Sequence, residues 1–297
     1  MRKYFWLILF LLALTRAENN AVDFLQTGLS ARSLALGNTG TAYGGHIDTV
    51  FLNPAALRET EYEFFSAAVQ DFELAENKIF ALAKRLEFYD RPVVLGLVYA
   101  GSSVRDIERN ALDADGRPVR DGNFSVGRNN YTLALACNAQ DDNWYGLSLR
   151  RYIYSLDTAA AEATALDAGA SWRLREIWGA DIYGGVSLRN IGRTKVYWST
   201  GHTDSIPFGL NSGLAIRREM FTLPLCLGLD WNWREDETVR FSSGLECDLQ
   251  TLVLRAGWDE RLTYGLGLRY YALTLDYAQT MHETLGLQQR VSLLLYL

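Results

Sequence analysis

The chain has 297 residues, of which 48% are hydrophobic and 22% charged, and its formal net charge at pH 7 is −6. An acidic balance of this kind repels nucleic acid and offers no basic surface for it. Beyond the N-terminus no apolar run approaches the roughly 20 residues of a spanning helix, which excludes a helical membrane protein but allows a β-barrel with polar residues at alternate strand positions.

The first 17 residues (1–17) predict an export signal. Arg2 and Lys3 precede an apolar run at residues 5–14, and small residues lead to a cleavage site after Ala17. The alternative, a transmembrane anchor, needs about twice that apolar length. Removing the signal's three basic residues from 29 Lys+Arg leaves 26 against 35 Asp+Glu, so the exported chain has a net charge near −9.

Residues 18–60 predict a segment that differs from the strands after it. The stretch 27–45 is rich in Gly and Ala, and an Asn-Pro-Ala sequence follows at 53–55. Asn53 is a good helix cap, and Pro54 suits the first helical position because proline lacks the N–H that would be unsatisfied there. We therefore expect a short helix to begin at Pro54.

From residue 61 to the end, short segments alternate between apolar and polar residues and are separated by turn residues. In the sixth segment, Leu166 and Trp172 share one face, whereas Asp167 and Arg173 share the other. A slip of one residue would turn charges toward lipid, at about 2–4 kcal/mol for a basic residue near the midplane, which fixes the register. The fourteen predicted strands are 62–70, 78–87, 93–101, 124–138, 143–154, 162–175, 179–190, 207–217, 221–234, 237–249, 251–259, 261–270, 271–279 and 286–297.

The same parity assigns a set of charged residues to the inner face of the barrel. Two interpretations are open: these residues line a water-filled channel, or they pair with one another and plug the lumen. The set comprises Asp167, Arg173, Arg189, Arg217, Asp230, Glu246, Arg255 and Arg269. Parity also turns Cys137 and Cys247 toward lipid and Cys226 toward the lumen, so we expect three free thiols.

The lengths of the connections favour a transmembrane barrel over a soluble β-sandwich, in which strands also alternate. If the first strand runs outward, the two longest gaps, 102–123 and 191–206, are both extracellular, and breaks such as 139–142 are periplasmic. Long outer loops, short periplasmic turns and Trp and Tyr near strand ends are typical of outer-membrane barrels.

The Gly-rich stretch that ends in Asn53-Pro54-Ala55 resembles the PorV/PorQ family of FadL-like outer-membrane β-barrel proteins. The resemblance continues through 206–215, 255–258, 265–270 and 275–278 and covers essentially the whole exported chain. It implies an all-β transmembrane barrel of fourteen strands (61–297) in the outer membrane of a Gram-negative bacterium, with residues 18–60 folded inward as a hatch.

No catalytic or metal site is predicted. The histidines His46, His202 and His282 lack the Asn-His-x-Ser arrangement that we associate with outer-membrane phospholipases, and there is no Gly-x-Ser-x-Gly sequence. The acidic stretch 113–116 lacks the later ligands of a calcium loop and predicts a turn. We expect no enzymatic activity and no cofactor.

Two functions and one structural alternative remain open. The FadL-like resemblance implies passage of a hydrophobic small molecule, and the PorV/PorQ resemblance implies an adaptor that docks exported proteins at the cell surface, as in type IX secretion. The third possibility is a closed structural barrel. In the first case the hatch residues expected to line or shift a binding pocket are Phe51, Leu52, Asn53, Pro54 and Ala55.

Overall fold

The computed structural model describes residues 30–42, 44–71, 75–140, 142–177, 179–220, 222–282 and 286–297. The predicted export signal and the first part of the predicted hatch, up to residue 29, lie outside these ranges. None of the described helices has the length and apolarity to cross a membrane.

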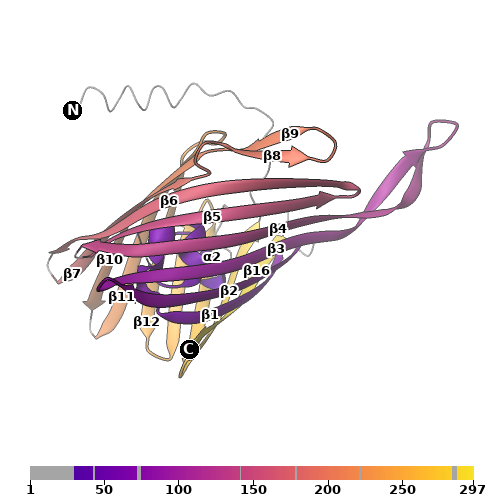
Figure 1. Ribbon diagram of the computed structural model, residues 1–297. Helices are drawn as coiled ribbons and strands as arrows, with labels where there is room; N and C mark the ends of the chain where they lie inside the picture. Colours follow the sequence, from indigo (N-terminus) through magenta and orange to yellow (C-terminus); the bar gives the residue numbers. More distant parts are fainter. Residues whose placement is uncertain are drawn as a thin grey trace.

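The strands form one antiparallel sheet that closes on itself (Figure 1). The wall strands are β1 (Tyr62–Asp71), β2 (Ala75–Phe88), β3 (Arg91–Leu112), β4 (Pro118–Gln140), β5 (Asn143–Leu156), β6 (Ala159–Ile177), β7 (Ala180–Arg189), β10 (Gly209–Met220), β11 (Leu223–Arg234), β12 (Arg240–Leu249), β13 (Leu252–Asp259), β14 (Leu262–Tyr270), β15 (Leu273–His282) and β16 (Gly286–Tyr296). Each pairs with its chain neighbour in the wall, and β1 pairs with β16 to close the ring. The predicted fourteen-stranded barrel is confirmed.

Side chains alternate across the wall, as the sequence predicts. In β5, Trp144, Ser148 and Tyr152 are buried, whereas Leu147 and Leu149 are exposed on the outer surface. All three cysteines are free. The register places Cys226 opposite Glu246 on the buried face, and Cys247 opposite Leu225 on the other face, so these thiols cannot meet.

Aromatic side chains gather on the outer surface near both ends of the wall. We call the end with the tight turns at 89–90 and 271–272 the turn end, and the opposite end the hairpin end. The turn end exposes Phe88, Tyr89, Tyr270 and Tyr271. Near the hairpin end Trp231 meets Phe241 with ring centroids 5.6 Å apart, and the exposed side chains of Trp258 and Tyr264 lie on the neighbouring strands. Two such girdles with aliphatic side chains between them suit a lipid bilayer.

The β3–β4 hairpin projects far beyond the rest of the wall (Figure 1). The loop predicted at 102–123 is therefore wrong, because β3 continues to Leu112 and β4 begins at Pro118. The turn between them is held by Asp113, whose Oδ1 accepts from the backbone N–H of Asp115 and Arg117 at 2.9 and 2.8 Å. This hairpin stands clear of the barrel, so solvent reaches both of its faces and the alternation that reveals a wall strand is absent.

The second predicted loop, 191–206, also contains strands. β8 (Thr194–Trp198) and β9 (Thr203–Ile206) form a small hairpin, and β8 pairs with β6 from Ala161 to Ala163. β5 and β6 likewise continue to a two-residue turn at 157–158. At the hairpin end, the strands predicted for β5 and β6 are therefore shorter than the observed ones.

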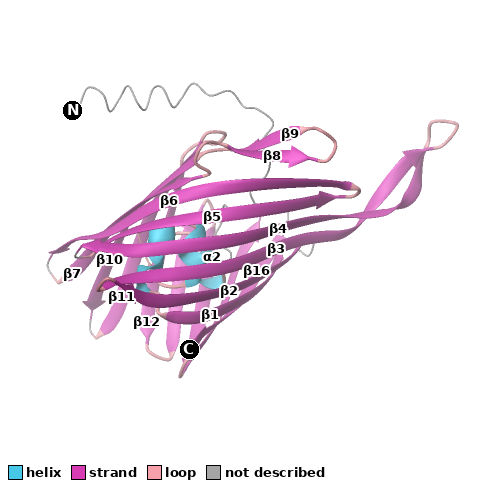
Figure 2. Ribbon diagram, in the orientation of Figure 1, coloured by secondary structure: helices cyan, strands magenta, loops and turns pink. Residues whose placement is uncertain are grey.

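Residues 30–42 and 44–60, which we call the hatch, lie inside the barrel, where Figure 2 shows their helices. The hatch comprises α2 (Ala31–Ala35) and the 3₁₀ helices η1 (Ile47–Phe51) and η2 (Pro54–Glu59). The interior around it has two unlike halves. Strands β1–β6 face the hatch mainly with apolar side chains, whereas β7 and β10–β16 supply most of the buried charges and amides.

Candidate functional site: the hatch and its contacts with the wall

The side chain of Asn53 forms hydrogen bonds both within the hatch and with the barrel wall. Its Oδ1 accepts from the backbone N–H of Ala55 at 3.0 Å, which makes it the predicted cap of the helix that begins at Pro54. Its Nδ2 donates to the carbonyl oxygens of Thr41 at 2.7 Å and of Ala170 in β6 at 3.0 Å. The sequence predicted the helix cap. It did not predict the hydrogen bond to Ala170, because that bond depends on the fold.

The other predicted hatch residues are buried. Phe51 and Ala55 belong to the large apolar cluster formed with β1–β6, and Pro54 is buried beside them. Leu52 lines a cavity of about 60 Å³ near the hairpin end, and its carbonyl accepts from Nδ2 of Asn211 at 3.1 Å. In this conformation these residues therefore pack the hatch against the wall.

Glycines on the inner face let the hatch backbone lie directly on the wall. A Cβ at Gly146 would come closer than 3.0 Å to the backbone of Ala55, and one at Gly185 would come equally close to Thr41. Any side chain there would displace the hatch. Gly244 and Gly257 meet the hatch backbone in the same way, whereas Gly96, Gly169 and Gly265 lie against hatch side chains.

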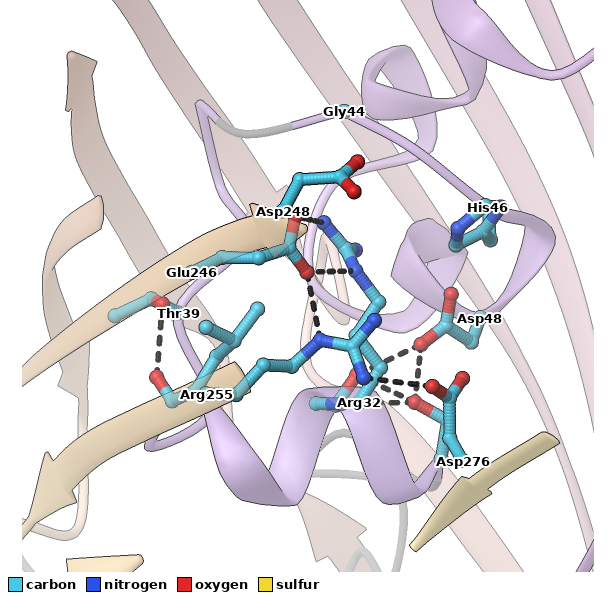
Figure 3. A network of polar contacts seen from close by, with 12 residues as sticks. Arg32, Thr39, Gly44, His46, Asp48, Glu246, Asp248, Arg255 and Asp276 are labelled. Atoms are coloured by element: carbon cyan, nitrogen blue, oxygen red, sulfur yellow. Dashed lines mark hydrogen bonds and ion pairs between the residues drawn. The ribbon is translucent and has the colours of Figure 1, made fainter. Parts of the chain in front are cut away.

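A buried charge network joins α2 to the polar half of the wall (Figure 3). Arg255 donates from Nε to Glu246 at 2.7 Å and from Nη1 to Asp276 at 2.6 Å. Arg32 of the hatch donates to the same Glu246 at 3.0 Å. The structure thus brings together Arg255 and Glu246 from the predicted inner-face set. Arg32 escaped sequence reasoning because no strand periodicity marks it, whereas Asp276 shares the inner parity and could have been found.

Asp230 holds the middle of the hatch. Its Oδ2 accepts from the backbone N–H groups of Gly40 and Thr41, both at 2.9 Å, and the side chain is buried. Hydrogen bonds to an ionised acceptor are among the stronger ones in proteins. Asp230 therefore fastens the hatch backbone to β11.

A second fastening lies at the turn end, where Arg217 of β10 donates to Glu59 of η2 at 2.6 Å. Arg58 and Arg217 both approach the ring of Tyr183, at 4.2 and 5.3 Å from its centroid. Burial alone would raise the pKa of the Glu59 carboxyl, but the guanidinium groups of Arg217 and Arg58 outweigh it and hold that pKa below its usual value. These groups border a polar vestibule of about 560 Å³, which Glu59 and Arg217 line.

The remaining predicted charges lie in three places. Asp167 accepts from Arg150 at 2.6 Å and from the backbone N–H of Asn190 at 2.8 Å, and both ion-pair side chains are 1% exposed. Arg150, which was missed, shares its parity with buried Ser148 and could have been found. Arg189 is buried beside the small cavity near the hairpin end. Near the turn end, partly exposed Arg173 pairs with Asp181 and Arg269 pairs with Asp248.

The charged inner-face residues therefore lie mostly in pairs and in bonds to the hatch. That arrangement corresponds to the interpretation in which they fill the lumen. Within the described ranges, no three His, Cys, Asp or Glu side chains converge as a metal site would require.

No family model and no curated protein matches this chain. Among solved structures, the Pseudomonas putida toluene transporter TodX has a TM-score of 0.55 and 11% identity over 94% of this chain and 98% of its own. A TodX deltaS2S3 mutant monoaromatic hydrocarbon channel gives 0.56 and 12% over 91% and 98%. The chain has the FadL-like barrel fold. At these identities the likeness concerns the fold alone.

Proposed function

We propose that this protein spans the outer membrane of a Gram-negative bacterium and passes a small hydrophobic molecule, with the hatch as its gate. The apolar outer band between two aromatic girdles supports the location. The hairpin end, with its long projections, is taken as extracellular. The toluene transporter TodX, whose fold is similar, supports the class of solute.

The apolar half of the interior is the observation that carries this proposal. There the hatch presents Ile47, Phe51 and Leu57 to a wall built largely from small apolar residues. If the hatch moves aside, these wall residues line a mostly apolar path. The buried pair of Arg150 and Asp167 also lies in this half, but most of the buried charged pairs occupy the opposite half of the interior. The small wall residues are Ala67, Ala81, Ala83, Ala100, Ala134, Ala136, Ala161, Ala163 and Ala165.

Uptake of labelled toluene by cells tests the proposal. A diderm host that lacks its own hydrocarbon channels should take up toluene several-fold faster when it makes this protein, because an outer leaflet of glycolipid slows apolar solutes. A labelled disaccharide serves as the control and should enter at the same rate with and without the protein. Equal toluene rates in the two strains would reject the proposed passage.

The projecting β3–β4 hairpin favours a second candidate, the PorV/PorQ-like adaptor. The hairpin exposes many charges of both signs around Asp113, Asp115 and Arg117, a surface on which an exported protein can dock. A pull-down from the native membrane tests it. Co-purification of surface proteins that depends on residues 104–124, without toluene uptake, would favour this function over the first.

A further inference from the structure

The outer surface of β2–β6 bears a row of side chains that crosses five strands at one level. The register pairs Phe80 with Tyr99, Tyr99 with Tyr131, Tyr131 with Arg151, and Arg151 with Thr164. The three aromatic rings follow one another with centroids 6.4 and 5.3 Å apart. Beyond these rings the row continues with the cation Arg151 and then Thr164, at the level where aromatic rings mark the boundary between lipid chains and headgroups.

On the turn-end side of this row the wall is hollowed by an apolar groove of about 620 Å³. Exposed aliphatic side chains line it, among them Leu82, Leu97, Leu133 and Leu149. The groove faces the lipid, and its lining suits an acyl chain.

On the hairpin-end side of the row lies a polar hollow of about 800 Å³ between β6 and β8. Lys195, Arg193 and Glu162 line it. Arg151 and Thr164 line both hollows. An apolar groove and a polar pocket thus meet at one guanidinium group, which is the arrangement that an amphipathic anion requires.

The existing partners of Arg151 leave room for a phosphate. Its Nη1 donates to Thr164 at 2.9 Å, and it pairs with Glu162, but these two charged side chains are 47% and 57% exposed. Ion pairs as exposed as this contribute only about 0.2–1 kcal/mol, and a guanidinium has five N–H donors. Arg193 is paired with Glu235, whereas Lys195 adds a further positive charge to the hollow that Arg151 lines.

We propose that this surface binds a phosphorylated glycolipid of the outer leaflet. A phosphate lies between Arg151 and Lys195, and an acyl chain of the same molecule lies in the groove below. Arg151 suits a phosphate because its planar donors bind two oxygens at once. The choice of an outer-leaflet lipid rests on the proposed function, since it requires the hairpin end to face outward.

Binding of bis-phosphorylated lipid A to the purified full-length protein in detergent tests the proposal, measured by native mass spectrometry. The double variant Arg151→Gln with Lys195→Gln should bind about thirtyfold more weakly than the wild type, as expected when two cations near the headgroups are lost. A matched control, Lys84→Gln with Arg218→Gln, removes two exposed cations from near the turn end and should bind like the wild type. Removing both phosphates from the lipid should weaken wild-type binding to the level of the first variant.

Three results would overturn the proposal: equal binding by the first double variant, equal binding of the dephosphorylated lipid, or equal binding of phosphatidylglycerol. Toluene uptake by the same variants separates this proposal from the proposed function. Passage should persist in the Arg151→Gln, Lys195→Gln variant. If cells that make the wild-type protein do not take up toluene faster, while the purified protein binds lipid A as expected, only the proposed passage is rejected.

Discussion

Asp230 shows how one carboxylate positions a segment of backbone. Two consecutive N–H groups, those of Gly40 and Thr41, converge on one oxygen in a buried place where water cannot replace it. A buried donor that loses its acceptor costs free energy, about 1–3 kcal/mol. The hatch therefore depends on this side chain although most of its contacts are apolar.

Asp230→Ala should loosen the hatch while the barrel stays assembled. We expect amide hydrogen exchange at residues 36–42 to accelerate by about tenfold to a hundredfold, because the two N–H groups lose a charged acceptor worth about 1.5–3 kcal/mol per bond. Asp230→Asn keeps one acceptor oxygen and should give an intermediate rate. Unchanged exchange in the alanine variant would mean that the apolar contacts alone hold the hatch.

Glu59 makes the ion pair with Arg217, which joins the hatch to the wall at the turn end, sensitive to acid. Because the folded protein holds the pKa of this carboxyl below its usual value, the pair with Arg217 stabilises the hatch at neutral pH. That stabilisation is lost as the pH falls from the usual carboxyl range through the lowered pKa. Since both side chains are about one-third exposed, the contribution is modest, about 1 kcal/mol or less.

Conductance in planar bilayers measures this effect. Between pH 7 and pH 3 the wild type should open more often as Glu59 gains a proton. Glu59→Gln should already open more often at pH 7 and should respond less to acid. If the two proteins share one pH profile, other carboxylates control the hatch.

At the scale of elements, the wall was predictable because lipid and lumen impose a period of two. Leu147 and Leu149 face outward and Ser148 faces inward for that reason. The β3–β4 projection was not predictable in this way, since both of its faces meet water. The hatch contacts were predictable in part: Gly146, Gly169 and Gly185 share the inner face and so could have marked the hatch, but the partner of Arg32 follows only from the fold.

The start of η2 offers a test at this scale. Asn53→Ala with Pro54→Ala removes a cap worth about 0.5–2 kcal/mol and the two bonds to Thr41 and Ala170. We expect the barrel to assemble and toluene uptake to change. Asn211→Ala, which removes the bond to the carbonyl of Leu52, is the milder comparison. Failure of the double variant to assemble would make the segment a folding element and end the gating interpretation.

The β3–β4 hairpin tests the orientation. An epitope inserted after Gly116, at the tip of the projection, should be stained on intact cells, because the hairpin end is proposed to face outward. The same epitope between Tyr270 and Tyr271, at the turn end, should require disruption of the outer membrane. The reverse pattern would invert the topology.

The whole molecule should behave as a closed barrel. Its wall strands are paired on both sides, so detergent finds no open edge at which unfolding can begin. Unboiled and boiled samples should therefore migrate differently on SDS gels. Equal mobility, together with release of the protein by osmotic shock, would contradict a transmembrane barrel.

The inward-facing glycines have a thermodynamic consequence for the whole molecule. They make the hatch a tethered ligand of its own barrel, present at a high effective concentration set by a short linker. A solute that occupies the apolar half must compete with this internal ligand, and its apparent dissociation constant equals the intrinsic one divided by the fraction of barrels whose hatch has moved aside. Substitutions that weaken the hatch should thus raise the apparent affinity for solute, even at residues that no solute touches.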